Sequence, residues 1–343
     1  MNRRFVRPLV LLLAAAAAGA GCDRRDEPLR DGGASERRIT VTRWDTLWSA
    51  GGALQDSLLL RPYLLAAGDS AVYVFDGGSS RLLAFGRSDG ALRWMSGRRG
   101  GGPGEFQRVR DLKLAANASP VLLDVANRRI TFLDGRGALR DEIPLPDVGY
   151  ADQMVPLADG RVVLLTDRPD SALAVVDRGG RVAERVPFPW QEFSKLHPLV
   201  RQGSLAASRH GESWVFGFSL GDGWLGFRGT RPLRDLNPYV EPAEFPKVET
   251  RSEGGTVTTR LASYTPCSGC DISMDGADVY VLFGGLTASR RALLDRYAVE
   301  SGRYRETFLL PVRATKAAVA DGVVYVLVDE PYPAVLALRP RRN

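Results

Sequence analysis

Two cysteines separated by two residues form the most reactive pair in the chain, in Cys267-Ser268-Gly269-Cys270. This spacing allows a redox pair, half of a zinc site or a local disulfide. A zinc site needs two further ligands, whereas the chain has three cysteines and two histidines in all. A redox pair normally stands at a helix N-terminus, and this pair precedes a predicted β-strand. The pattern favours a structural disulfide that fixes how the chain enters that strand.

Histidines and recurring acids are the other candidates for catalysis or metal binding. His197 precedes a proline in an aromatic-rich loop, and His210 stands in a predicted hairpin turn; both settings favour a polar loop residue over a base or ligand. Four aspartates follow Val-rich runs at matching places, namely Asp76, Asp124, Asp167 and Asp329. Acids at equivalent positions favour a turn-capping role over a shared Ca²⁺ site. We therefore assign no catalytic residue, no metal and no cofactor.

A repeated pattern must position all of these residues. A polar turn followed by a short Val/Leu-rich run occurs six times, with the runs at 71–75, 120–125, 161–165, 213–218, 277–283 and 323–328. Short β-branched runs are typical of buried strands, and Asn, Asp and Gly turns close hairpins. A shorter segment precedes each run and an alternating stretch follows most of them, which gives four strands per unit. The pattern predicts an all-β, six-bladed β-propeller with four-stranded blades.

The two ends of the chain predict how the ring closes. The last unit stops after the strand at 334–340 and is one strand short. A spare strand stands near the N-terminus, from Ile39 to Leu47. Pairing the two would close the ring and hide its edges. A β-sandwich or a β-solenoid is the alternative, but six near-equivalent units are unusual for a sandwich, and a solenoid has a shorter and more regular period.

One connector between units carries a family resemblance. The segment Gly100-Gly101-Gly102-Pro103-Gly104-Glu105-Phe106 resembles the connectors of NHL-like and TolB-like bacterial six-bladed propellers. There a Gly-rich turn and a Phe precede each inner strand, and the resemblance implies that Phe106 fills the gap between two blades. Val109 stands near the place where that family often has a proline, and the other five connectors lack the motif. The resemblance implies a propeller over residues 39–343 and transfers no catalytic residue.

The N-terminus predicts the location of the protein. Three arginines precede the apolar stretch 9–18, which is too short to span a bilayer as a mature helix. Small residues then precede Cys22, as in the lipobox of bacterial lipoproteins, although Gly19 replaces the usual leucine. We expect residues 1–21 to be a signal peptide, Cys22 to be lipidated and residues 22–38 to be a flexible tether. The mature protein would be anchored in the cell envelope, facing the periplasm or the exterior. The alternative is an ordinary secretory signal that leaves Cys22 free.

Charge argues against a nucleic-acid partner. The chain has 46 Lys and Arg against 40 Asp and Glu, for a net charge of +6. Removing residues 1–21 takes away three arginines and no acid, which leaves 43 against 40. The remaining bases are interleaved with acids, whereas a nucleic-acid surface needs a concentrated basic stripe. We expect a monomer.

Two breaks in the repeat are the predicted binding regions. The insertion at about 231–266 contains Tyr239, Phe245 and a predicted hairpin that turns at 253–255. The aromatic-rich segment 188–198 contains Trp190, Phe193 and His197. Insertions in repeat folds often form the binding face. The sequence therefore favours a binding or scaffold propeller that engages a protein, peptide or glycan, and a divergent metal-dependent hydrolase of the lactonase kind is the alternative.

Overall fold

The computed structural model describes residues 37–53, 58–145, 148–168, 172–186, 188–209, 212–253, 256–262, 267–285 and 289–341. The predicted signal peptide, Cys22 and most of the predicted tether lie outside these residues, as does His210. Among the described residues, no helix is long and apolar enough to cross a membrane.

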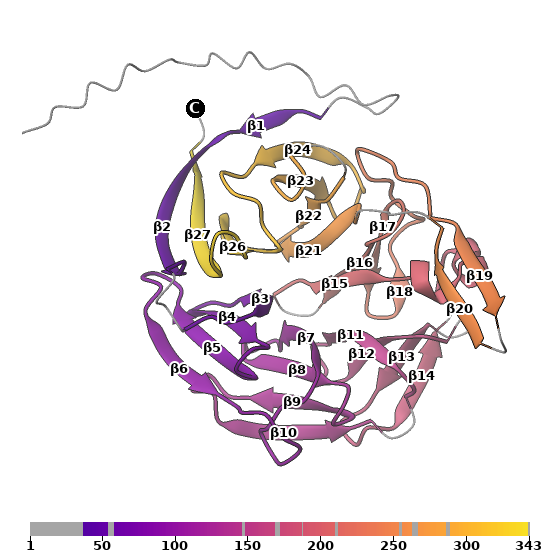
Figure 1. Ribbon diagram of the computed structural model, residues 1–343, viewed down its shortest axis with the longest axis horizontal. Helices are drawn as coiled ribbons and strands as arrows, with labels where there is room; N and C mark the ends of the chain where they lie inside the picture. The colour runs from indigo at the N-terminus through magenta and orange to yellow at the C-terminus, as the bar shows by residue number, and fades with distance from the viewer. Residues whose placement is uncertain are drawn as a thin grey trace, which may run out of the picture.

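Six sheets of strands surround a common axis, as Figure 1 shows, and confirm the predicted six-bladed propeller. Blade 1 consists of β3 (Pro62–Ala67), β4 (Ala71–Asp76), β5 (Arg81–Gly86) and β6 (Leu92–Ser96), and blade 2 of β7 (Val109–Leu114), β8 (Pro120–Asp124), β9 (Arg129–Leu133) and β10 (Leu139–Pro144). Blade 3 consists of β11 (Ala151–Pro156), β12 (Val162–Thr166), β13 (Leu173–Val176) and β14 (Val182–Val186), and blade 4 of β15 (Gly203–Ala207), β16 (Ser213–Phe218), β17 (Trp224–Arg228) and β18 (Arg231–Pro232). Blade 5 consists of β21 (Gly269–Asp275), β22 (Asp278–Phe283), β23 (Leu293–Ala298) and β24 (Tyr304–Leu309). Blade 6 contains β25 (Lys316–Ala320), β26 (Val323–Val328) and β27 (Ala334–Arg341).

The N-terminal strand closes the ring, as predicted. Strand β2 (Arg43–Gly51) pairs antiparallel with β27 and supplies the outer strand of blade 6. The preceding β1 (Ile39–Val41) does something that the repeat pattern does not predict, because it pairs in parallel with β24 as a fifth strand of blade 5. Figure 1 shows β1 and β2 as one continuous arc along the outside of the two blades.

The hydrophobic core lies between neighbouring blades. The second strand of every blade is almost entirely buried, since its side chains face the next blade on one side and the previous blade on the other. Phe106 is fully buried in the cluster shared by blades 1 and 2, where its ring makes an edge contact with Phe75 at 5.6 Å. This confirms the predicted role of Phe106.

The inner strands surround the axis, and side chains join them to one another. Each inner strand packs beside the next, from β3 through β7, β11, β15, β21 and β25 back to β3. An inner strand leaves backbone N–H groups unpaired along its inner edge. Asp111 accepts one from Met154 of blade 3 at 2.8 Å, and Asp271 accepts one from Ala317 of blade 6 at 3.0 Å. These carboxylates therefore tie neighbouring blades together around the axis.

The described part of the N-terminal arm, residues 37–41, starts at Arg37, whose side chain packs inside blade 5. This corrects the boundary predicted for the tether. Arg37 donates to the buried carboxylate of Asp295 through Nε and Nη2, each at 3.1 Å, and it forms an ion pair with Glu241 of the insertion. Its guanidinium lies 3.9 Å from the centre of the Phe283 ring. Arg38 follows on the surface, where its backbone carbonyl accepts from Thr307 N at 2.9 Å. Residues 37 and 38 therefore belong to the propeller.

Candidate functional site

The insertion between blades 4 and 5 is fastened to the propeller at its base. The Tyr239 hydroxyl donates to the Phe218 carbonyl at 2.8 Å, and Val240 N donates to the Tyr297 hydroxyl of blade 5 at 2.9 Å. Tyr239 N donates to Asp222, whose pKa is raised by burial and lowered in part by this bond. Tyr239 is 3% exposed, so it packs inside the protein and presents no anchor at the surface.

Beyond this base the insertion forms the predicted hairpin. Strands β19 (Val248–Glu253) and β20 (Thr256–Leu261) make a two-stranded ribbon that stands beside the ring in Figure 1. Its described side chains are exposed or half-exposed, and Val257 is 66% exposed. Among the described residues, neither strand pairs with a third, so each has an open backbone edge. The ribbon leaves and rejoins the base at one point, where Ala262 N donates to the Lys247 carbonyl at 2.8 Å.

The two predicted binding regions meet in one aromatic cluster. Its hub is Phe218 at the end of β16, which contacts Trp190 at 5.5 Å, Phe193 at 6.1 Å and Phe245 at 5.1 Å. Trp190 also stacks on Phe245, with ring centres 5.5 Å apart. Phe193 is 1% exposed, whereas Trp190 and Phe245 are half-buried. Contact of these rings with a partner stays a prediction, and their observed role is to brace the insertion against blade 4.

His197 has a local structural role. It precedes the short 3₁₀ helix η2 (Pro198–Val200), and its Nδ1 accepts from Leu199 N at 3.2 Å. Helix η1 (Gln191–Lys195) lies just before it and carries the buried Phe193. The His197 side chain is exposed and caps a turn, in agreement with the prediction of a polar loop residue.

The cysteine pair is joined by a disulfide between Cys267 and Cys270. Ser268, between them, donates its backbone N–H to the Ser219 carbonyl of blade 4 at 2.9 Å. Gly269 begins β21 beside the Tyr239 hydroxyl, and an added Cβ there would clash with that oxygen. The disulfide therefore closes the tight turn by which the chain passes from blade 4 into blade 5.

Two of the four recurring acids bind backbone N–H groups. Asp76 accepts from Leu60 N at 3.1 Å and from Ser79 N at 2.7 Å, and Asp124 accepts from Gln107 N at 2.8 Å. Both carboxylates are fully buried and use both oxygens in this way, which confirms the turn role for these two. The other two, Asp167 and Asp329, are exposed.

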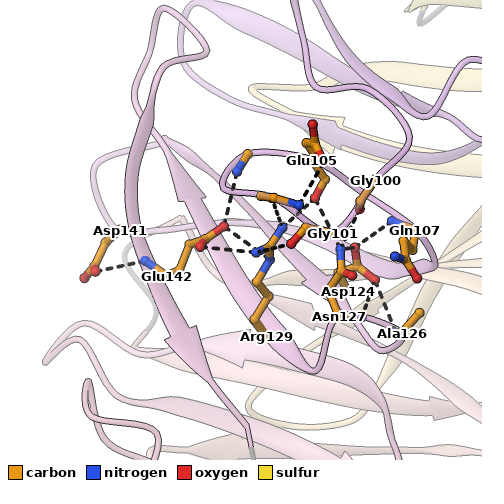
Figure 2. A network of polar contacts seen from close by, with 12 residues as sticks. Gly100, Gly101, Glu105, Gln107, Asp124, Ala126, Asn127, Arg129, Asp141 and Glu142 are labelled. Atoms are coloured by element: carbon orange, nitrogen blue, oxygen red, sulfur yellow. Dashed lines mark hydrogen bonds and ion pairs between the residues drawn. The ribbon is translucent and has the colours of Figure 1, made fainter.

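The Gly-rich connector is held by side chains of blade 2, as Figure 2 shows. Arg129 donates to the carbonyls of Gly102 and Glu105 at 2.6 and 2.7 Å and also pairs with Glu142 at 3.2 Å. Asn127 donates to the Gly100 carbonyl at 3.0 Å. These hydrogen bonds hold the Gly-rich connector in place between blades 1 and 2.

The inner strands of all six blades enclose a central channel of about 630 Å³ that was not among the predicted sites. Near the start of β7 it is lined by Arg110, which pairs with Asp152 at 2.9 Å. Two further ion pairs line the inner strands, Lys113 with Asp111 at 2.6 Å and Lys316 with Asp271 at 3.0 Å. The signal for this lining was present in the sequence. In two inner strands, β7 and β21, polar residues alternate with apolar ones, where a purely structural strand would be apolar on both faces.

At the other end, where the inner strands turn back, one arginine bridges the channel mouth. Arg209 of blade 4 pairs with Asp69 of blade 1 at 3.0 Å and with Asp321 of blade 6 at 2.9 Å. Blades 1 and 4 lie opposite each other in a six-bladed ring, so this side chain crosses the opening. Arg87 adds a second ion pair to Asp321 at 2.7 Å. The two arginines lower the pKa of Asp321 below its usual value.

Comparisons with known proteins agree with this architecture. No protein-family model matches the chain, and no curated protein does. A Bacteroides fragilis protein provisionally described as exported is 12% identical, with a TM-score of 0.53 over 89% of this chain and 97% of its own. Virginiamycin B lyase of Staphylococcus aureus is 11% identical, with a TM-score of 0.51 over 87% and 99%. A Bacteroides vulgatus member of the DUF4221 family is 9% identical, with a TM-score of 0.52 over 89% and 100%. At these identities the similarity concerns the fold alone, which the strands of this chain define as a six-bladed β-propeller.

Proposed function

We propose that this protein is an extracytoplasmic binding propeller, held at a membrane by lipid on Cys22, which captures a protein partner through the β19–β20 ribbon. The basic, apolar and small-residue pattern before Cys22 supports the anchor, and the exported description of the B. fragilis protein is in keeping with the location. The partner would contribute an extended segment that pairs with an edge of the ribbon.

The observation that carries this proposal is the contrast between the base and the ribbon. The base is fixed by buried hydrogen bonds of Tyr239 and Val240 and by the aromatic cluster around Phe218. The ribbon itself pairs with no third strand among the described residues and leaves its side chains exposed or half-exposed. An isolated two-stranded hairpin is at best marginally stable in water. A well-fixed base that carries an unpaired ribbon supports a role in which the ribbon packs against a partner protein.

Open strand edges favour a polypeptide over a glycan. A strand at an edge presents a row of unpaired N–H and C=O groups, which a second chain satisfies by adding a strand. Charges of both signs alternate along the ribbon, including Glu249, Arg251 and Arg260, and limit pairing with other copies of itself. Val257 offers one exposed apolar side chain beside this edge.

Site-specific photo-crosslinking in intact cells tests the proposal. A benzophenone side chain at position 257 should give an adduct that mass spectrometry identifies as a protein. The same group at Leu139, which is 41% exposed on the outer strand of blade 2, is the matched control and should not give that adduct. Joining Lys247 to Ala262 by a two-glycine turn removes the ribbon where its ends already meet and should leave the melting temperature nearly unchanged. Equal crosslinking from both positions, or only glycan adducts at 257, would refute the proposal.

A further inference from the structure

The channel has the size and lining of a small-molecule site. Its volume of about 630 Å³ lies within the range of about 300–1,000 Å³ usual for such sites. Apolar side chains of several inner strands make much of the wall, including Leu65, Leu114 and Ala207. Six acidic and four basic side chains also line the channel, and the donors that they leave unpaired decide what chemistry it can recognise.

Two ammonium groups lie on opposite sides of the channel. Lys113 bonds to Asp111 in the gap between blades 2 and 3, and Lys316 bonds to Asp271 in the gap between blades 5 and 6. These two gaps lie on opposite sides of a six-bladed ring. The Lys113 and Lys316 side chains are 17% and 25% exposed, so both reach the channel space.

The aspartates of these pairs accept further hydrogen bonds from the backbone, whereas each lysine keeps donors that are not used within its pair. Asp111 accepts from Met154 N and Leu112 N as well as from Lys113, and Asp271 accepts from Ala317 N as well as from Lys316. An ammonium has three donors. Among the described residues each lysine makes one hydrogen bond, so two donors of each stay open to a ligand.

A buried hydroxyl is a further donor group in the channel wall. Ser273 follows Asp271 by two residues on β21, so both side chains lie on one face of that strand. Ser273 is 9% exposed and lines the channel, and its Oγ has no hydrogen-bond partner among the described residues. Buried polar groups are rarely left unsatisfied, and such a group calls for an explanation.

We infer that the channel binds a small organic anion with an apolar body, whose acidic head is held by Lys113, Lys316 and Ser273. Its body packs along the apolar inner strands. The Arg209 bridge to Asp69 and Asp321 crosses the opposite mouth, so the molecule enters where the inner strands begin. Arg110 stands in the lining at that entrance, where its guanidinium pairs with Asp152 at 2.9 Å.

Fluorescence titration tests this inference with 8-anilinonaphthalene-1-sulfonate, an apolar anion, and with Nile red, an uncharged apolar dye. Lys113→Met and Lys316→Met should each weaken binding of the anionic dye about tenfold or more, since hydrogen bonds to charged groups contribute about 1.5–3 kcal/mol. Nile red binding should change little. Lys195→Met removes a lysine that is 70% exposed and does not line the channel, and it is the matched control.

Two further variants keep the test decisive if a methionine variant folds poorly. Lys113→Arg retains the charge and should retain anion binding. Ala207→Phe fills the channel and should reduce binding of both dyes. Decanoate should displace the anionic dye, whereas decanol should not. Unchanged anion affinity in both methionine variants, or in Ala207→Phe, would overturn the inference. Because the ribbon takes no part in these measurements, their failure is separate from any failure of the crosslinking experiment.

Discussion

Replacing Arg37 with alanine removes the cation that neutralises Asp295 inside blade 5. The Asp295 side chain is 1% exposed, and two guanidinium nitrogens bind it at 3.1 Å. Within the described part of the chain, the other hydrogen bond to this carboxylate comes from the Thr307 hydroxyl, at 2.6 Å. The variant also loses the ion pair with Glu241 and the contact with the Phe283 ring.

The expected loss of stability at neutral pH is large. Removing one partner of a buried ion pair costs about 3–5 kcal/mol, because the other charge stays buried without compensation. For a domain of this size each kcal/mol corresponds to roughly 2 °C, so the melting temperature should fall by roughly 6–10 °C. Thermal denaturation followed by circular dichroism measures this shift.

The pH dependence has a definite sign. Burial raises the pKa of Asp295 above its ordinary value of 3.8, while Arg37 and Thr307 oppose that rise. A raised pKa means that the folded state binds more protons than the unfolded state, so this group's contribution to stability falls as pH rises from 3.8 through the folded value. Loss of Arg37 raises the folded pKa further. The deficit of Arg37→Ala should therefore be largest at about pH 7 and shrink toward about pH 4.

Two variants separate this explanation from a general effect of the N-terminal arm. Arg38→Ala changes the neighbouring surface residue and should cost no more than about 0.5 kcal/mol. Adding Asp295→Asn to Arg37→Ala removes the uncompensated charge and should recover a substantial part of the lost stability. If the double variant is no more stable than Arg37→Ala, or if the deficit does not depend on pH, the reasoning is wrong.

Three further changes test other parts of the structure by thermal denaturation. Tyr239→Phe leaves the buried Phe218 carbonyl without its side-chain donor and should cost about 1–2 kcal/mol, and no loss would mean that water or another donor replaces the hydroxyl. Asp124→Ala strands several backbone N–H groups and should cost about 2 kcal/mol or more, against a negligible effect of Asp329→Ala at the exposed equivalent position. Replacing Cys267 and Cys270 together by serine should cost no more than about 2 kcal/mol, because the loop is so short, and a larger loss would point to a wider role in blade 5.

The architecture could be predicted because six units of the sequence repeat the same pattern of turns and strands. Strands such as β4 and β26 are mostly apolar and are buried along their whole length, since both of their faces meet a neighbouring blade. The closing strand was predictable for a related reason, because only one segment was missing from the last unit. The pairing of β1 with β24 was not, since three residues carry no periodicity that distinguishes blade 5 from blade 6.

The candidate sites were harder to predict because they depend on contacts between distant segments. Trp190 and Phe245 stack on each other although 55 positions separate them, and nothing local in the sequence shows that Phe218 contacts both rings. Tyr239 has the composition of a surface anchor but is buried by its hydrogen bond to blade 4. Lys113 and Lys316 come from segments that were interpreted as structural strands, and their positions on opposite sides of the channel emerge only once the ring is closed.

The order of attachments along the N-terminal arm has a mechanical consequence. A pulling force applied upstream of Arg37 reaches the Asp295 ion pair first, then the parallel pairing of β1 with β24, and only then the closing strand β2. We therefore expect the ion pair and the short β1–β24 pairing, which can form again, to break before any force acts on the pairing of β2 with β27. We expect the ring to stay closed under a pulling force on the N-terminal side that breaks only these first two contacts.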